Sequence, residues 1–259
     1  MRFFPLFSGS SGNCSLIEGG GVRVLIDAGL SGKAIEAALT EYALSPDTID
    51  AILITHEHID HIRGVGVLSR RYDIPVYANT GTWQGMCGII GNISPKNERV
   101  FETGRSFFIK QLDISPFSTP HDANESVCYV CMAEGRKLSI MTDIGHVTNA
   151  LLSAVEYSNL LLLESNYDIE MLDVGSYPYP LKRRIKGNHG HLSNEDAGAA
   201  LVKLYNRGIK RTILGHLSKE NNTEIIARLT VENALAENEI YDMSLCVAHR
   251  DRSCGQFYV

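Results

Sequence analysis

The chain has 259 residues, and its 24 lysines and arginines against 30 aspartates and glutamates give a formal net charge of -6. Hydrophobic residues make up 44% of the chain and charged residues 21%, which is the composition of an ordinary globular protein and excludes a disordered, collagen-like or disulfide-dependent chain. The acidic balance also argues, at first sight, against a nucleic-acid partner, because such proteins are usually basic.

The sequence predicts a cytoplasmic protein with no membrane partner. No run approaches the ~18–20 apolar residues that span a bilayer, and the apolar stretch 1–7 is too short for a signal peptide. Cys128 and Cys131 form a C-x-x-C motif inside a strand-like run, and no second cysteine pair or nearby histidine completes a zinc site there. We therefore expect these thiols to be reduced and buried.

Short apolar runs alternate along the chain with longer runs of helical period, and no linker or repeat interrupts them. Residue content and length predict strands at 22–27, 51–55, 76–78, 106–114, 126–133, 138–142, 160–164, 212–214 and 243–248. Helices are predicted at 32–42, 62–72, 147–156, 179–186, 194–207 and 223–238, with Ser193 or Asn194 as the N-cap of the fifth. This order predicts one α/β domain over residues 1–259.

Several predicted strands run directly into a side chain that can bind a ligand. Asp27 follows Val-Leu-Ile, His56 follows Ile-Leu-Ile-Thr, and Asp143 follows Ser-Ile-Met-Thr. In α/β folds a rigid strand delivers such a group to the edge of the sheet, where sites are built.

The densest cluster of metal-binding residue types lies in residues 55–61, Thr-His-Glu-His-Ile-Asp-His. His56 and His58 project to one side if the backbone there is extended, while Asp60 and His61 lie on the turn into the next helix. Imidazole and carboxylate together suit zinc, manganese or iron. The alternative is a histidine-rich surface loop, which would need neither Asp60 nor the buried strand before it.

This motif and the donors that follow it resemble the metallo-β-lactamase superfamily, whose signature is His-x-His-x-Asp-His, then a distant His, an Asp and a final His. The resemblance implies an αββα sandwich of two mixed β-sheets flanked by helices, with two divalent metal ions (zinc or manganese, with iron as a further candidate) as cofactors. It implies these ligands: His56, His58 and His121 for one ion, Asp60, His61 and His216 for the other, Asp143 between them, and Asp27 orienting an imidazole.

Three departures narrow the choice within the superfamily. Asp143 stands where true β-lactamases of this fold have Cys, which argues against antibiotic hydrolysis. His58 stands where diiron flavoproteins have Glu, which argues against redox chemistry. The length leaves no room for the inserted domain of the β-CASP nucleases. The stretches 6–15, 163–168, 187–195 and 214–222 resemble the YycJ/WalJ (VicX) type, cytoplasmic bacterial proteins linked to exonuclease activity on DNA.

Substrate-binding residues are expected around these stretches. Ser10, Ser11 and Asn13 lie in a glycine-rich turn that offers donors to an anion or is simply a tight hairpin. The N-terminus of the helix predicted at 194 favours an anion, so a phosphate is expected to bind near His191. The cationic run at 182–186 is either part of this surface or only a solvated helix face. The full set of candidates is Ser10, Ser11, Asn13, Asn166, Lys182, Arg183, Arg184, His189, His191, Ser193 and Asn194.

The resemblance implies a two-metal phosphodiesterase, a 5′→3′ exonuclease in DNA repair or processing, in which a hydroxide between the metals attacks phosphorus. Asp60 and Asp143 would hold the hydroxide, and His191 would contact the phosphate or protonate the leaving oxygen. DNA is favoured over RNA as the nucleic-acid partner. The alternatives are an RNA-processing nuclease, a glyoxalase II-like thioesterase and a non-catalytic regulatory module; oligomeric state stays open.

Overall fold

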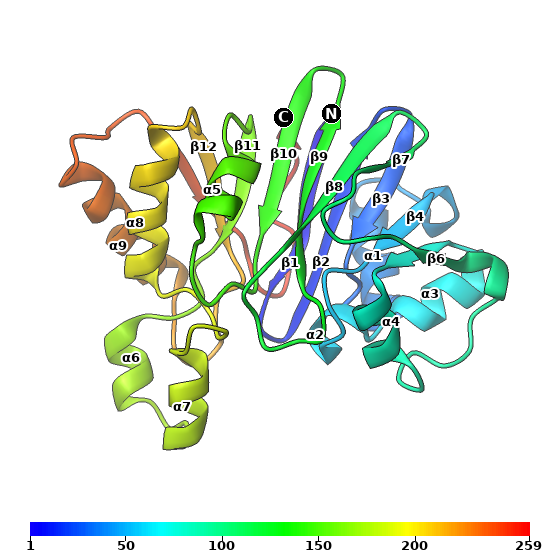
Figure 1. Ribbon diagram of the computed structural model, residues 1–259, viewed down its shortest axis with the longest axis horizontal. Helices are drawn as coiled ribbons and strands as arrows, with labels where there is room; N and C mark the ends of the chain where they lie inside the picture. The colour runs from blue at the N-terminus through cyan, green and yellow to red at the C-terminus, as the bar shows by residue number, and fades with distance from the viewer.

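The computed structural model describes residues 1–259 and arranges them in four layers (Figure 1). Two seven-stranded mixed sheets face each other, and helices cover both outer faces. This is the αββα sandwich that the family resemblance implied. The first sheet has the order β14-β1-β2-β3-β4-β5-β6, with β1 (Arg2–Gly9), β2 (Gly12–Gly19), β3 (Val22–Ile26), β4 (Ala51–Leu53), β5 (Val76–Ala78), β6 (Glu98–Val100) and β14 (Phe257–Tyr258).

The second sheet has the order β13-β12-β11-β10-β9-β8-β7. Its strands β10 to β13 are parallel to one another, as are β3 to β6 of the first sheet. Its members are β7 (Phe107–Ile109), β8 (Leu112–Ser118), β9 (Val127–Ala133), β10 (Arg136–Met141), β11 (Leu160–Glu164), β12 (Arg211–Gly215) and β13 (Ser244–Val247).

The helices divide between the two outer faces. On the first sheet lie α1 (Gly32–Glu41), α3 (Val65–Tyr72) and α4 (Thr80–Met86), with the short α2 (Ile59–Ile62) before α3. On the second sheet lie α5 (Asn149–Val155), α8 (Asn194–Tyr205) and α9 (Glu224–Ala236). Two more helices, α6 (Ile169–Val174) and α7 (Tyr179–Ile185), hang beyond the end of the sandwich (Figure 1), and 3-10 turns occupy Pro46–Thr48 and Pro95–Asn97.

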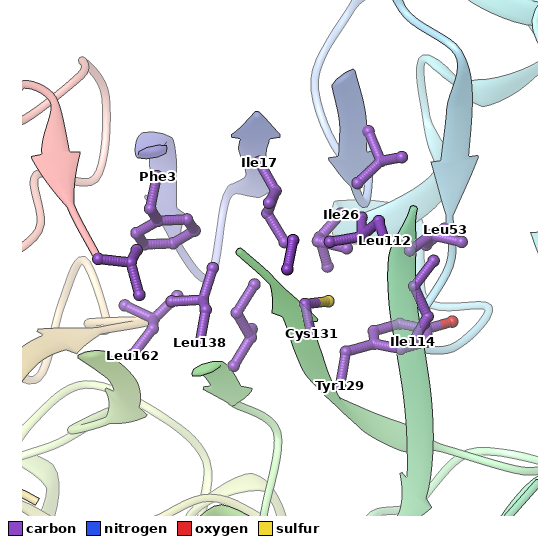
Figure 2. Close-up of a cluster of buried hydrophobic side chains, with 14 of the residues drawn as sticks. Phe3, Ile17, Ile26, Leu53, Leu112, Ile114, Tyr129, Cys131, Leu138 and Leu162 are labelled. Atoms are coloured by element: carbon purple, nitrogen blue, oxygen red, sulfur yellow. The ribbon is translucent and has the colours of Figure 1, made fainter. Parts of the chain in front are cut away.

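The central core fills the space between the two sheets. Figure 2 shows Phe3 and Ile17 of the first sheet facing Leu138 and Leu162 of the second. Tyr129 is fully buried in this cluster, and its hydroxyl donates a 2.6 Å hydrogen bond to the carbonyl oxygen of Ile54 across the sandwich. The hydrophobic effect therefore holds the sheets face to face, while this one polar link is satisfied internally.

The structure differs from the sequence prediction at the N-terminus, where β1 and β2 were not predicted as strands. The turn between them forms a tight hairpin, which was one of the two interpretations of this glycine-rich turn. Both strands are buried on both faces, so their residues lack the polar alternation of a half-exposed strand. Pro5 also argues against a strand, yet the register of the hairpin shifts between Pro5 and Phe7. This irregularity in the ladder accommodates a residue that has no N–H to donate.

Two other predicted elements had the wrong boundaries. The run 106–114 is not one strand but the hairpin β7–β8, which turns at Lys110 in a left-handed conformation with φ 50° and so carries no glycine signal. The helix predicted at 62–72 begins earlier and is divided into α2 and α3. The predicted N-cap is confirmed, since the Ser193 hydroxyl accepts the Asp196 N–H at the start of α8.

The two cysteines of the C-x-x-C motif are free and buried, as predicted. Cys128 packs toward the outer helices and Cys131 toward the other sheet, so the two thiols lie on opposite faces of β9 and cannot share a ligand. Burial raises the pKa of each thiol to about 12. In the whole structure, no helix combines the length and apolarity needed to cross a membrane.

Replacing Phe3 with alanine tests the importance of the core between the sheets. Phe3 is fully buried, so Phe3→Ala should lower the free energy of unfolding by about 3–5 kcal/mol. The matched control is Phe108→Ala, because the Phe108 side chain is 67% exposed and its loss should cost less than about 0.5 kcal/mol. Urea denaturation measures both; equal losses would contradict this account of the core.

Candidate metal centre and active-site cavity

The predicted metal ligands come together at one edge of the sandwich. Parallel strands present their carboxyl ends to the same edge, so Asp27 after β3 and His56 after β4 meet Asp143 after β10 and His216 after β12. The loop between β8 and β9 supplies His121. Both sheets therefore contribute to one site.

Three of these residues turn the chain sharply where their strands end. Asp27, Asp143 and His216 have φ values of 60°, 57° and 56°, in the left-handed region that side chains other than glycine rarely adopt. Such conformations cost free energy and persist only where the surrounding structure imposes them, which is common at functional sites.

The first predicted set of ligands forms a cluster. His56, His58 and His121 have nitrogen atoms within 4.8 Å of one another. The Nδ1 atom of His58 lies 3.0 Å from Nε2 of His56 and 3.3 Å from Nε2 of His121. His121 is fixed by its other nitrogen, since its Nδ1–H donates to the carbonyl oxygen of Gly190 at 3.0 Å and leaves the Nε2 lone pair facing the cluster.

The second predicted set forms a neighbouring cluster. Asp60, His61 and His216 also present donor atoms within 4.8 Å of one another. Nε2 of His61 lies 3.5 Å, and Nε2 of His216 lies 3.7 Å, from Oδ2 of Asp60. The side-chain amide of Asn13 points to the same His61 nitrogen at 3.0 Å, which places the tip of the β1–β2 hairpin against this cluster.

Asp143 lies between the two clusters. Its Oδ2 is 3.4 Å from Nε2 of His61, and its Oδ1 is 3.8 Å from Nε2 of His121. Oδ2 of Asp143 and Nε2 of His216 are buried and have no hydrogen-bond partner. Buried polar atoms without partners are costly, and a carboxylate oxygen and an imidazole nitrogen are ligands for a divalent cation. The donors present therefore fit a site for two metal ions.

Asp27 holds one of these histidines in place. Its Oδ2 accepts the Nδ1–H of His61 at 2.8 Å, while the backbone and hydroxyl of Thr55 donate to its two oxygens. The Thr55 hydroxyl also contacts Nδ1 of His56 at 3.0 Å. With their Nδ1 atoms engaged, both rings direct Nε2 toward the metal clusters.

Glu164 is a candidate functional residue that the sequence analysis missed, although it lies in the stretch 163–168 named there. It ends β11 after four leucines, and it is fully buried. Its Oε1 accepts from Nδ1 of His191 at 2.7 Å and Nδ1 of His216 at 2.8 Å. Its Oε2 accepts the Ile144 N–H at 2.9 Å. The rule that pointed to Asp27 and Asp143, a strand running into an acid, would have found Glu164 too.

The carboxylates make the site strongly favourable to positive charge. Burial opposes protonation of His61, but Asp143, Asp27 and Asp60 outweigh it and hold the pKa of this imidazole well above its usual value. Burial likewise opposes protonation of His216, yet Asp143, Asp60 and Glu164 raise its pKa to about 10. The negative charge of these four acids is therefore concentrated where cations are needed to compensate it.

A cavity of about 400 Å³ opens beside the metal clusters. Its polar part includes Asp60, Asp143, His191 and His216, and its far wall comes from α7. Arg184 lies on that wall and forms an ion pair with Asp122. The cavity therefore joins the metal-binding groups to one cation of the run 182–186.

The remaining candidate residues divide into three groups. Ser10, Asn166 and His191 line the cavity, and Asn13 contacts His61 beneath it. Ser193 and Asn194 are buried, the first capping α8 and the second bonded to Ser165 and Asn222. The others do not line the cavity: Lys182 and Arg183 line a separate depression on the other side of α7, and Ser11 and His189 are exposed.

Residues 22–217 match the family model described as the beta-lactamase superfamily domain. The chain belongs to the metallo-β-lactamase superfamily. Two relatives in this family are similar over most of the chain. Exodeoxyribonuclease WalJ of Streptococcus pneumoniae is 42% identical over 241 residues, and Exodeoxyribonuclease YycJ of Bacillus anthracis is 40% identical over 237 residues. Each alignment covers 92% of this chain and 90% of the relative.

A solved structure supports the fold independently. The Zn²⁺-bound PqqB of Methylobacterium extorquens superimposes with a TM-score of 0.77, over 100% of both chains. Only 17% of its residues are identical to this chain, so this likeness shows the fold alone.

Substitution of Glu164 tests its part in the metal centre. Glu164→Gln removes the charge that holds His191 and His216, so metal affinity should fall by about 10–100-fold. The control is Glu57→Gln, because this carboxylate lies in the metal-binding loop but accepts from the Asn124 backbone. Competition with a chromophoric chelator measures both affinities. If the two variants bind metal equally well, Glu164 does not position these ligands.

Proposed function

We propose that this chain is a metal-dependent exonuclease that hydrolyses phosphodiester bonds of DNA from the 5′ end, in DNA repair or processing. The observation that carries the proposal is the pair of ligand clusters joined by Asp143 beside a cavity that also holds His191 and Arg184. The names of the WalJ and YycJ relatives favour DNA over RNA as the nucleic acid.

The metals would be held by the two predicted clusters, His56, His58 and His121 on one side and Asp60, His61 and His216 on the other, with Asp143 in between. Imidazole and carboxylate donors suit zinc, manganese and iron. When bound, two such cations lower the pKa of a water molecule and stabilise the charge that develops on a phosphate.

The protein's own carboxylates would align the attacking water. Asp60 is only partly buried and lines the cavity, so one of its oxygens can accept a hydrogen bond from a water molecule there. Asp143 is almost fully buried, and its Oδ2 has no partner within the protein. These two acids orient the water toward a phosphate that enters from the cavity.

His191 would serve the leaving group. Its Nδ1 donates to Glu164, so a protonated ring presents Nε2–H on its other side, and the ring lines the cavity. That N–H can donate to a phosphate oxygen or transfer its proton to the departing 3′-oxygen. Glu164 keeps this ring oriented during the step, because its Oε1 accepts the Nδ1–H at 2.7 Å.

The polarity of the reaction depends on which end of the strand the cavity holds. Ser10 lies at the tip of the β1–β2 hairpin, and it lines the same cavity as Arg184. We infer that these two groups bind the terminal 5′-phosphate, so that the next phosphate lies at the metal clusters, which would set the register for removal of one nucleotide at a time.

A nuclease assay on the metal-loaded protein tests the proposed function. Zinc- or manganese-loaded protein should release mononucleotides from the 5′ end of labelled DNA, and His58→Ala should abolish release because it removes a metal ligand. The control His146→Ala should stay active, since His146 is outside the cavity and contacts the Asn188 carbonyl. RNA and a thioester serve as competing substrates. Turnover of the thioester without cleavage of any nucleic acid would contradict the proposal.

A comparison of two neighbouring arginines tests the phosphate contact. Arg184 lines the cavity and Arg183 lines the depression behind α7. Arg184→Ala should weaken DNA binding. It should also make the negative slope of log K against log salt less steep by about 1, because one phosphate contact is lost. Arg183→Ala should change the slope less. Fluorescence anisotropy at several salt concentrations measures both slopes. A larger change for Arg183→Ala than for Arg184→Ala would indicate that DNA binds on the outer face of α7.

A further inference from the structure

One exposed apolar side chain lies within the metal-binding loop. Ile59 follows His58, a donor of the first cluster, and precedes Asp60, a donor of the second. Ile59 belongs to none of the three hydrophobic cores, 51% of it is exposed, and it lines the active-site cavity. An isoleucine offers no lone pair to a cation, and exposed apolar surface is unfavourable in water. Neither metal binding nor the packing of the sandwich therefore accounts for this residue.

The start of α2 brings Ile59 to the cavity. His58 is the N-cap of this helix, with an extended backbone (φ -62°, ψ 146°), and Ile59 is the first helical residue. The chain changes direction here, so His58 and Asp60 reach different clusters while the residue between them lines the cavity. The other apolar residues of the cavity, Leu181 and Ile185 of α7 and Tyr177 before it, lie far along the chain. Ile59 alone among the four adjoins residues of the metal clusters.

The covalent structure of DNA decides which part of a substrate lies beside Ile59. In the reaction proposed above, the leaving group is the 3′-oxygen of the terminal nucleotide. The 2′ carbon is bonded to the carbon that carries this oxygen, whereas the 2′ carbon of the next nucleotide is separated from the attacked phosphorus by most of its own sugar. A phosphate at the two metal clusters therefore brings the 2′ position of the terminal nucleotide close to Ile59, the residue that separates two of their donors.

Resting on the nuclease function proposed above, we propose that Ile59 determines the sugar specificity of the enzyme by packing on the 2′ carbon of the terminal nucleotide. Deoxyribose presents a CH₂ group there, and its contact with an apolar side chain is favourable. Ribose presents a hydroxyl, which must give up hydrogen bonds to water and gains none from isoleucine. The 2′-hydroxyl is the group by which a protein tells RNA from DNA. Ile59 thus selects DNA by leaving that hydroxyl without a partner.

The test compares 5′-phosphorylated strands that differ in one sugar. An apolar contact rejects an added hydroxyl by up to about 100-fold. For the wild-type protein, kcat/KM at the first linkage should therefore be about 10–100-fold higher for an all-deoxyribose strand than for the same strand with ribose in the terminal nucleotide. Ribose in the second nucleotide should matter much less, because its 2′ position lies away from the attacked phosphorus.

Variants of Ile59 connect this preference to the side chain. Ile59→Ser supplies a hydroxyl that can bond the ribose, so it should narrow the preference by about tenfold, whereas Ile59→Val keeps an apolar contact and should keep the preference. Because Ile59 adjoins two metal-binding residues, each protein is judged by the ratio of its rates on the two strands, in which any loss of metal cancels. The matched control is Ile89→Ser, since Ile89 is 56% exposed and lies outside the cavity.

Binding supplies a readout that needs no turnover. Strands with a phosphorothioate at the first linkage resist hydrolysis, and their affinities can be measured by competition in fluorescence anisotropy. The wild-type, Ile59→Val and Ile89→Ser proteins should bind the deoxyribose end about tenfold more tightly than the ribose end. Ile59→Ser should bind the two ends with nearly equal affinity.

Three results would overturn the inference. Equal cleavage of deoxyribose and ribose ends by the wild type would show that the 2′ position is not read. An unchanged ratio in Ile59→Ser, or an equal fall of its rates on both strands, would make Ile59 merely structural. The same loss of preference in Ile89→Ser would separate the effect from the cavity. Failure of the nuclease proposal is distinguishable from all three, because then no protein cleaves either strand, while the binding ratio still decides whether Ile59 distinguishes the sugars.

Discussion

The structure depends on a set of carboxylates that are buried at one edge of the sandwich. A buried anion is tolerated only where hydrogen-bond donors and cations surround it. Asp27 draws Thr55 and His61 together, and Glu164 joins His191, His216 and the Ile144 backbone. Each acid thus fixes several segments at once. The orientations of the imidazoles, which metal binding requires, follow from satisfying these anions.

The same edge connects the two sheets. The tip of the β1–β2 hairpin reaches across to the loop after β12, where Gly9 pairs with Leu217 and the Ser8 hydroxyl accepts the His216 N–H at 2.9 Å. His56 and His61 belong to the first sheet's loops, while Asp143 and His216 belong to the second's. Because the core between the sheets fixes their spacing, the metal clusters form only when the sandwich is closed.

The acidic net charge and a nucleic-acid substrate are compatible in this arrangement. Four of the acids, Asp27, Asp60, Asp143 and Glu164, surround the metal clusters, where divalent cations would offset them. The cationic run on α7 is divided by the helix, so that Arg184 alone among residues 182–184 lines the cavity. Electrostatic attraction would then act at one opening and not over a broad surface, which suits an enzyme that engages one end of a strand.

The sequence by itself determined one α/β domain, most strands and helices, and the donor cluster of residues 55–61. These depend on short-range patterns: apolar runs of strand length, and the spacing of His56, His58, Asp60 and His61. The αββα sandwich and the distant ligands followed from the resemblance of the sequence to the metallo-β-lactamase superfamily. Only the tertiary structure decided where other side chains point. It made β1 a strand despite Pro5, turned Ser193 and Asn194 inward, and placed Glu164 against two histidines. Local sequence sets the path of the backbone and the chemistry it carries, whereas the partner of a side chain is set by segments far away in the chain that packing brings beside it.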